Sequence, residues 1–418
     1  MTDVDICIVG PGIVALSTAM QLIELNPALS VILLEKEQEI GRHQTSHNSG
    51  VLHAGVYYQP GSLKAEFCRI GVGATVRFCR EHGIPLEQCG KLLVATDAVE
   101  LERMKDLERR SRENGLRIES LDRTALAHRE PRIAGLGALF VPTTGIVDWH
   151  QVALAMADRF RAAGGIILTQ CEASVISEGP NDVTVIAGSE RIRTKHLIAC
   201  GGLMADRLAD LCGVGSDFRI VPFRGEYFVL PESKNDLVKH LIYPIPNPSL
   251  PFLGVHLTRM IGGYVTVGPN AVLGLAREAY RRRDIRLSDM RDYLTFPGFW
   301  RMLRAHFGAG ISEFGSSLSR RRYLALCREY CPELALDDLL PHRAGVRAQA
   351  VLRDGTLVHD FLIRTSARTI HVCNAPSPAA TCSLPIGSHL TRLAAAHFAL
   401  VVKRGDRQVL PQVGACAV

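Results

Sequence analysis

Residues 4–35 have the sequence VDICIVGPGIVALSTAMQLIELNPALSVILLE, and this stretch decides the fold. Residues 4–9 predict a buried strand, residues 13–25 a helix with apolar spacing, and residues 30–35 a second strand. A strand, a helix and a second strand in this order predict a βαβ unit, the building block of a parallel sheet.

The turn between the first strand and the helix carries a dinucleotide-binding pattern. Residues 10–15, GPGIVA, fit G-x-G-x-x-[G/A]. Gly10 makes the tight turn, Gly12 lets the backbone approach a pyrophosphate, and Ala15 permits close packing of helix on strand. Glu35 ends the second strand and is placed to accept hydrogen bonds from a ribose. The pattern also occurs as a plain structural turn, and it does not separate FAD from NAD.

The next segment favours a flavin. Residues 41–58, GRHQTSHNSGVLHAGVYY, are rich in small, hydroxyl and amide side chains and lack a core-forming pattern. A loop of this kind offers many donors to phosphate and to a polar ring edge. Nicotinamide enzymes normally have helix and strand in this region, so we expect FAD.

The composition is that of a folded enzyme. The 418 residues are 47% hydrophobic and 22% charged, enough for two cores. The net charge of +6 is spread over both halves, which argues against nucleic-acid binding and favours attraction for small anions. No apolar stretch reaches the roughly 18 residues that span a bilayer, and the acidic N-terminus is unlike a secretory signal. We therefore expect a cytoplasmic protein.

The cysteines predict reduced thiols. All 12 lie at irregular spacings, without a CxxC pair or a Cys/His group at metal-ligand spacing. No metal site is expected.

Two kinds of segment alternate along the chain. Residues 152–163 predict a helix, and residues 165–168 and 196–200 predict strands that return to the first sheet. The stretches near 84–145 and 218–280 alternate apolar and polar residues, as in Tyr264-Val265-Thr266-Val267, and predict an antiparallel sheet. Residues 286–335 are helical in pattern, and residues 379–402 predict a last long helix.

This alternation predicts an α/β fold with two interleaved domains. A Rossmann-like, FAD-binding domain would be discontinuous and made of residues 1–83, 146–217 and 341–418. An α+β substrate domain, built on a mixed and largely antiparallel sheet, would take residues 84–145 and 218–340.

Six motifs stand out along the chain: HNSGVLHAGVYY at 47–58, PGSLKA at 60–65, PFLGVH at 251–256, GPNAV at 268–272, RAGVRAQ at 343–349 and NAPSPAAT at 374–381. Together they resemble the L-2-hydroxyglutarate dehydrogenase (oxidase) family, which belongs to the D-amino-acid-oxidase-like flavoproteins. The resemblance covers nearly the whole chain, in order.

The resemblance implies a fold and an activity. The fold would be an FAD-binding Rossmann-like domain with an inserted mixed-sheet substrate domain, in agreement with the segments above. The activity would be oxidation of L-2-hydroxyglutarate to 2-oxoglutarate, with electrons passed from FAD to an acceptor such as a membrane quinone or oxygen. Cys382 stands where the family usually has another small residue and raises the alternative of a thioether to the flavin; a non-covalent flavin is expected.

The expected FAD ligands come from five parts of the chain. Residues 374–378 would begin the last helix and direct its N-terminal dipole at the flavin N1–C2=O edge. The backbone of Val175 would meet the adenine. The full set is Gly10, Gly12, Ile13, Val14, Ala15, Glu35, Lys36, Arg42, Thr45, Ser46, Asn48, Ser49, Gly50, Val51, Val175, Gly201, Gly202, Ser377, Pro378, Ala379 and Thr381.

Oxidation of a 2-hydroxy acid needs a base for the hydroxyl proton while hydride leaves C2 for the flavin N5. His53 is the preferred candidate and His256 the second; either could instead be structural. A dicarboxylate needs two cationic clusters, because burying an unpaired carboxylate is costly. Lys64, Arg259 and Arg347 are the candidate cations, with Tyr57, Tyr58 and Tyr243 as hydroxyl donors. Arg224 is expected to pair with Glu226 instead.

Two other functions remain open. An amine or amino-acid oxidase of the glycine-oxidase type would keep the flavin and need one carboxylate clamp. A flavin-binding protein without turnover is disfavoured, because it would have little use for His53. Residues 293–301, YLTFPGFWR, could rest on a membrane surface or pack as a helix corner. The physiological acceptor and the oligomeric state are left undetermined.

Overall fold

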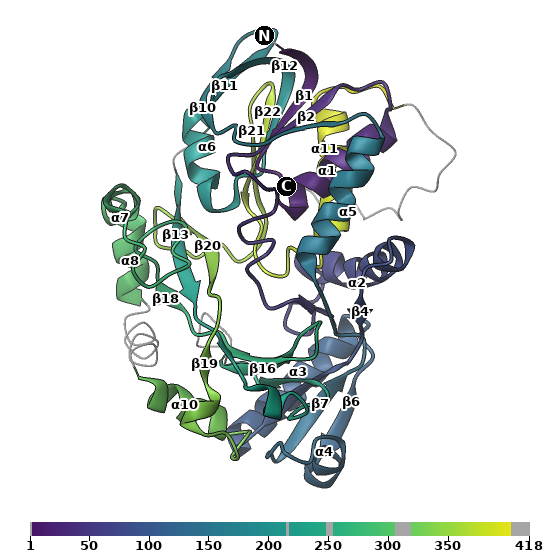
Figure 1. Cartoon of the computed structure of the whole chain (residues 1–418), viewed down its shortest axis with the longest axis vertical. Helices are drawn as coiled ribbons and strands as arrows, with labels where there is room; N and C mark the ends of the chain where they lie inside the picture. The colour runs from purple at the N-terminus through teal and green to yellow at the C-terminus, as the bar shows by residue number, and fades with distance from the viewer. Residues whose placement is uncertain (1, 215–216, 248–253, 306–318, 403–418) are drawn as a thin grey trace.

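Two large sheets organise the chain in the computed structural model, which describes residues 2–214, 217–247, 254–305 and 319–402. Figure 1 shows them toward opposite ends of an elongated molecule, with the N-terminal strand in the upper sheet.

The first sheet is built around the N-terminal strand-helix-strand unit. Its path is β10-β11-β12-β1-β2-β9, with β22 beside β12 and β21 beside β22. β1 pairs in parallel with both β2 and β12, which confirms the predicted βαβ unit. The strands are β1 Thr2–Val9, β2 Val31–Leu34, β9 Ile166–Leu168, β10 Ala173–Glu178, β11 Val183–Ala187, β12 Glu190–Ala199, β21 Leu362–Thr365 and β22 Thr369–Asn374.

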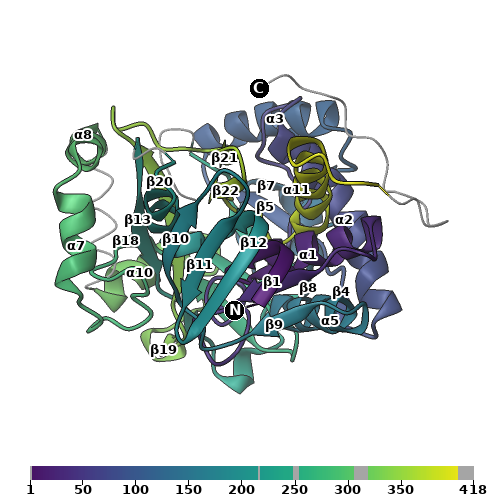
Figure 2. The same ribbon diagram turned by 90° about the horizontal axis from the view of Figure 1, so that it is seen from above.

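Helices cover both faces of this sheet. α1 (Ile13–Leu25) packs between α5 (Trp149–Ala162) and α11 (Ser383–His397), and α2 (Leu63–Glu81) packs against α11. Figure 2 shows α1, α5 and α11 on one side of β1 and β12. α6 (Ala205–Leu211) contacts β10, β12 and β22. α1 is apolar on nearly all sides because it is enclosed by the sheet and by two helices.

The second sheet has the order β19-β14-β17-β16-β15-β5-β7-β6. Only the β15–β5 pair is parallel, so the sheet is mixed and largely antiparallel, as predicted. Its strands are β5 Lys91–Ala95, β6 Glu119–Asp122, β7 Gly137–Val141, β14 Phe228–Val229, β15 Leu241–Pro244, β16 His256–Arg259, β17 Val265–Gly268 and β19 Leu340–Pro341. Three helices accompany it, α3 Ala98–Glu113, α4 Arg123–Arg129 and α10 Arg320–Arg328.

Two small sheets complete the arrangement. One is β18-β13-β20, made of Val272–Leu273, Phe218–Gly225 and Gly345–Leu352, and α7 (Leu287–Leu294) and α8 (Pro297–Ala305) pack on it. The other is β3-β8-β4, made of Val51–Leu52, Gly145–Val147 and Leu86–Glu87. Short 3-10 turns occur at η1 Gly202–Met204, η2 Glu232–Lys234 and η3 Leu336–Asp338. The predicted domain bounds stay a prediction.

The last helix is shorter than the predicted 379–402. It begins at Ser383, because residues 378–382 form turns in which Cys382 N–H donates to Pro378 O at 3.0 Å. It ends at His397, where Ala399 takes a left-handed conformation with φ 51° and Leu400 N–H donates back to Ala395 O. The prediction that residues 374–378 begin this helix was therefore wrong. The helical pattern of 286–335 resolves into α7, α8 and α10, with residues 306–318 outside the described residues.

Candidate active site

A cavity of about 850 Å³ lies between the two large sheets. Val9 and Leu34, at the carboxyl ends of β1 and β2, line it from the first sheet, and Tyr243 and His256 line it from the second. Binding sites in open parallel sheets lie outside the carboxyl ends of the strands. The cavity therefore extends from the position where a dinucleotide would bind to a wall that the second sheet forms.

The β1–α1 turn forms one end of the cavity. Gly10 has φ +87°, and a Cβ there would lie 2.8 Å from the carbonyl oxygen of Cys200, so only glycine fits. Gly12, Ile13, Val14 and Ala15 line the cavity at the N-terminus of α1. The positive end of the helix dipole thus faces the space where a pyrophosphate would lie.

Glu35 follows β2 and lines the same end. It is 7% exposed, and one carboxylate oxygen accepts a hydrogen bond from Glu37 N–H at 3.0 Å. Burial raises the pKa of Glu35. Ribose hydroxyl donors would give this buried carboxylate the partners that it needs.

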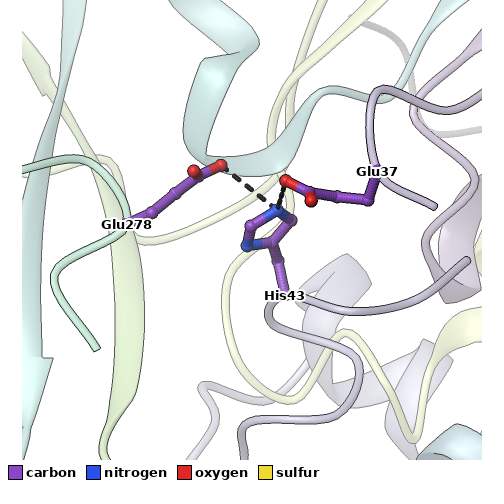
Figure 3. A group of neighbouring side chains, drawn as sticks. All are labelled: Glu37, His43 and Glu278. Carbon is purple, nitrogen blue, oxygen red and sulfur yellow. Dashed lines mark hydrogen bonds and ion pairs between the residues drawn. The ribbon is translucent and has the colours of Figure 1, made fainter. Parts of the chain in front are cut away.

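A polar cluster of Glu37, His43 and Glu278 lies beside Glu35 at the same end of the cavity (Figure 3). His43 Nε2 lies 3.0 Å from Glu37 Oε1 and 3.2 Å from Glu278 Oε1. Lys36 Nζ pairs with both carboxylates, at 2.9 Å and 2.5 Å. Because an ammonium already bridges the acids, the cluster acts as a clamp between the loop after β2 and the segment after β18. Glu278 was not among the residues expected at the site.

Most of the expected FAD ligands line this cavity. Those that do are Gly10, Gly12, Ile13, Val14, Ala15, Glu35, Lys36, Arg42, Thr45, Asn48, Ser49, Val51, Gly201, Gly202, Ser377, Pro378, Ala379 and Thr381. Ser46, Gly50 and Val175 do not; Ser46 Oγ instead donates to Gly41 O and contacts His150 Nδ1. Val175 is 44% exposed on β10, whereas Glu172 and Ala173 just before it line the cavity.

His53 follows β3 and lines the cavity. Its backbone N–H donates to Thr381 Oγ1 at 3.0 Å, and its carbonyl accepts from Cys68 Sγ at 2.8 Å. Among the residues that the structure describes, its Nδ1 atom is buried without a hydrogen-bond partner. Burial lowers the pKa of His53 well below its ordinary value, assisted by Lys91, His256 and Lys64. The side chain is therefore a neutral imidazole with an unsatisfied nitrogen.

His256 begins β16 and is 5% exposed. Its Nδ1 lies 3.0 Å from Gly254 O, and since a carbonyl can only accept, Nδ1 carries the proton and Nε2 is the acceptor. The ring stacks on Tyr243 with centroids 3.9 Å apart. Burial lowers the pKa of His256 to about 4. Of the motif PFLGVH, residues 251–253 lie outside the described residues.

The structure brings only some of the expected substrate-binding residues to the cavity. Arg347 on β20 and Tyr243 on β15 line it. Lys64 donates to His359 O at 2.9 Å, and Arg259 pairs with Glu87 at 3.6 Å, so neither cation lines it. Tyr57 and Tyr58 also lie outside the lining. Arg224 pairs with Glu226 at 2.8 Å, as predicted.

Several lining residues were not among the expected ligands, although Pro269 and Asn270 belong to the family motif at 268–272. Tyr227, Pro269 and Asn270 reach the cavity from the strands and turns of the second half. Lys91, on β5 behind Tyr57 and Tyr243, was also missed, since a lysine in an apolar run was not expected to be buried.

Cys382 is fully buried at the start of α11 and belongs to the core around α1, α2 and α5. It does not line the cavity, although Thr381 beside it does.

These features fit FAD. The glycine turn, the helix N-terminus and Glu35 match a pyrophosphate and a ribose, and the polar loop 41–53 continues toward His53. The volume is within the range of sites for large cofactors.

Known proteins agree with this description. Residues 5–393 match a family model described as FAD dependent oxidoreductase. The chain is 53% identical over 388 residues to L-2-hydroxyglutarate dehydrogenase from Escherichia coli (strain K12), covering 92% of each chain. It is 44% identical over 416 residues to the mitochondrial L-2-hydroxyglutarate dehydrogenase of Nematostella vectensis, covering 95% of this chain and 91% of that one.

A solved structure shares the fold. The L-alpha-glycerophosphate oxidase from Mycoplasma pneumoniae with FAD bound superposes with a TM-score of 0.78 at 21% identity, covering 99% of this chain and 100% of that chain.

Proposed function

This chain belongs to the FAD-dependent oxidoreductases and, within them, to the L-2-hydroxyglutarate dehydrogenase family, and from that premise we propose that it oxidises L-2-hydroxyglutarate to 2-oxoglutarate. The family, the fold class and the FAD cofactor predicted from the sequence are thereby confirmed. One observation carries the substrate proposal: two neutral histidines, His53 and His256, line the same cavity as Arg347, and this cavity begins at the glycine turn.

The residues of the chain divide the reaction between them. When bound, FAD would supply the two-electron acceptor for the hydride that leaves C2. His53, which lines the cavity, accepts the hydroxyl proton on its neutral imidazole. His256, fixed by Gly254 O, accepts a second hydrogen bond through Nε2. Arg347 binds a carboxylate.

The charge of the substrate prepares His53 for this role. In the free protein the pKa of His53 is low, which keeps the base neutral but makes it weak. Two carboxylates in the cavity favour the protonated imidazole and raise this pKa. The base therefore becomes stronger only when the substrate is present.

The test is anaerobic reduction of the purified yellow protein. L-2-Hydroxyglutarate should bleach the long-wavelength flavin band, while the D-isomer and glycine should not. Bleaching by glycine or another amino acid alone would favour the glycine-oxidase alternative, and a flavin that no 2-hydroxy or 2-amino acid bleaches would favour a binding protein without turnover.

We further propose a quinone as the electron acceptor. The support is the amphipathic segment 283–304, whose exposed side chains include Ile285, Leu287 and Trp300 together with Arg283, Arg286 and Arg304. Among the described residues, no helix is both long and apolar enough to cross a bilayer.

Contact with the membrane through this segment is tested with vesicles that contain anionic lipid. The protein should sediment with them, and Trp300→Glu should reduce that fraction. The reduced protein should be reoxidised by a short-chain quinone faster than by oxygen; faster reoxidation by oxygen would make it an oxidase.

A further inference from the structure

Lys91 is a buried lysine that faces the wall of the active site. It begins β5 and is 1% exposed. Its Nζ lies 3.4 Å from the hydroxyl of Tyr57, 4.6 Å from the centroid of the Tyr57 ring and 4.9 Å from that of Tyr243. The Lys91 amino group thus lies among the π-systems of two tyrosines, Tyr57 and Tyr243, and Tyr243 lines the cavity.

The surroundings of Lys91 contain bases, phenols and a thiol. His53 and Tyr57 face it from the loop before α2, Cys68 from α2, Tyr243 from β15 and His256 from β16. In the part of the chain that the structure describes, no carboxylate lies within ion-pair distance of it. A buried cation without an anion is costly, so burial lowers the pKa of Lys91 to about 7.

A dicarboxylate needs two positive charges, and three of the cations that line the cavity already pair with carboxylates: Lys36 with Glu37 and Glu278, Arg42 with Glu37, and Arg207 with Asp289 and Asp292. Of the three cations expected from the sequence, only Arg347 lines the cavity; Lys64, which is near enough to affect His53, donates to the carbonyl oxygen of His359, and Arg259 pairs with Glu87. Arg347 can clamp one carboxylate. The second carboxylate of a five-carbon diacid would enter a low-dielectric site and needs a counter-charge.

We propose that Lys91 is a positioning residue that supplies this second positive charge, and that its amine takes up a proton from solvent when a dicarboxylate binds. The proposal rests on the proposed function and names the group that makes the site select a dianion over a monoanion. Lys91 acts through space and through the Tyr57 hydroxyl and the Tyr243 ring, because it does not itself line the cavity.

The neutral form of the Lys91 amine stabilises the protein without ligand, and the charged form makes the site prefer a dianion. Without ligand, the neutral amine avoids repulsion with His53 and His256, whose pKa values a charged Lys91 lowers further. With a dianion in place, the attraction between unlike charges in a poorly polarisable site favours the ammonium. Binding and protonation are therefore linked.

The first test is proton uptake by the FAD-loaded wild-type protein at pH 8, measured by calorimetry in buffers of different ionisation enthalpy. Binding of 2-oxoglutarate should take up about 0.5–0.9 proton, because an amine with a pKa near 7 is mostly neutral at pH 8 before binding. 2-Oxobutyrate, which lacks the second carboxylate, should take up less than about a third of that amount. The histidines should contribute little at pH 8 even after a dicarboxylate raises their pKa values, since these start far lower.

The second test uses three variants. Lys91→Met should weaken 2-oxoglutarate binding by roughly 10–100-fold and 2-oxobutyrate binding by less than about threefold, and proton uptake should disappear. Lys91→Arg should keep the preference for the diacid without proton uptake, because a guanidinium is charged throughout. Lys105→Met on α3 is the matched control, since Lys105 is 69% exposed and pairs with Glu102 on the surface.

The outcomes separate the two proposals. If L-2-hydroxyglutarate bleaches the flavin and 2-oxoglutarate binds without proton uptake, the role of Lys91 is overturned while the proposed function stands. Equal weakening of both ligands in Lys91→Met would make the lysine merely structural and also overturn it. If neither compound binds, the proposed function fails and the role of Lys91 fails with it.

Discussion

The active-site wall is made of basic residues that burial keeps neutral. His53, His256 and Lys91 come from three different segments, and in each the low pKa has burial as its largest cause. If all three side chains were protonated they would repel one another, because Lys91 acts on both histidines. A nearly uncharged site therefore favours the folded state of the free protein. The negative charge of a bound substrate then favours the protonated forms of these side chains.

His53→Gln tests the base directly. Glutamine keeps a hydrogen-bonding side chain but cannot take up the hydroxyl proton, so flavin reduction should slow by roughly 10²–10⁴-fold while FAD stays bound. The measurement is stopped-flow bleaching without oxygen. His128→Gln, at an exposed position on α4, is the control. Unchanged reduction would transfer the role of base to another group, with His256 the next candidate.

Lys91→Met should also stabilise the protein, with a defined pH dependence. The folded pKa of about 7 is below the ordinary 10.5, so between these values the unfolded chain binds a proton that the folded protein does not. The free energy of unfolding of the wild type therefore rises as the pH increases from 7 to 10. At pH 7, the variant should be more stable by about 2–5 kcal/mol, or about 2–5 °C in Tm for a chain of this size.

The measurement is the Tm of the wild type and of Lys91→Met, each saturated with FAD, at pH 7 and at pH 9.5. The advantage of Lys91→Met should shrink at the higher pH, where wild-type Lys91 is neutral in the folded state and partly neutral in the unfolded state. An advantage of equal size at both pH values would contradict a buried, uncharged amine.

At the scale of elements, the loop after β2 is the part that shapes the cavity. It has little regular structure, and side-chain hydrogen bonds hold it: Asn48 Nδ2 donates to Thr45 O at 2.7 Å, and Thr45 Oγ1 accepts from Ile13 N–H at 3.1 Å. The clamp of Lys36, Glu37, His43 and Glu278 fastens the same loop to the segment after β18 (Figure 3). Cofactor binding and loop position should therefore be coupled.

Glu278→Gln tests this coupling. The change removes one of two carboxylates around Lys36 and His43, so the segment after β18 should hold the loop less firmly and FAD should bind roughly 2–10-fold more weakly. The dissociation constant is read from flavin fluorescence during reconstitution of the apoprotein. Glu102→Gln, which breaks an exposed pair on α3, should leave it unchanged. Equal affinities in both variants would show that the clamp is not coupled to the cofactor.

At the scale of the whole molecule, a buried ion pair joins α6, which packs against the first sheet, to the segment before α7. Arg277 is fully buried and binds both oxygens of Asp206 on α6, each at 2.7 Å. Asp206 also accepts from Ile220 N–H of β13 at 3.0 Å. One residue pair thus fixes α6, β13 and the segment between β18 and α7 relative to each other.

Arg277→Met should destabilise the fold strongly, because it leaves Asp206 as a buried charge without its partner. The expected loss is about 3–5 kcal/mol, or about 3–6 °C in Tm for 418 residues. Thermal unfolding with saturating FAD measures it. Arg304→Met, at an exposed position on α8, should change Tm by less than about 1 °C. A loss no larger than this control would mean that the pair contributes nothing to the fold.

Local sequence determined the parts of the site that depend on backbone. Gly10 and Gly12 with Ala15 define a turn that only a few residue types can form, and the apolar run of residues 4–9 can only be a buried strand, so the cofactor end of the cavity was predictable. The motifs at 47–58 and 374–381 identified the family for the same reason: they are contiguous.

Tertiary structure alone decided which charges reach the substrate. Lys64, Arg259 and Arg347 are equivalent as sequence, yet two are held by His359 and Glu87, and only Arg347 lines the cavity. Lys91 and Glu278 carried no sequence signal, because their roles depend on neighbours more than 30 positions away. The pKa of a side chain is set by burial and by charges around it, and these exist only when distant strands and loops have packed together.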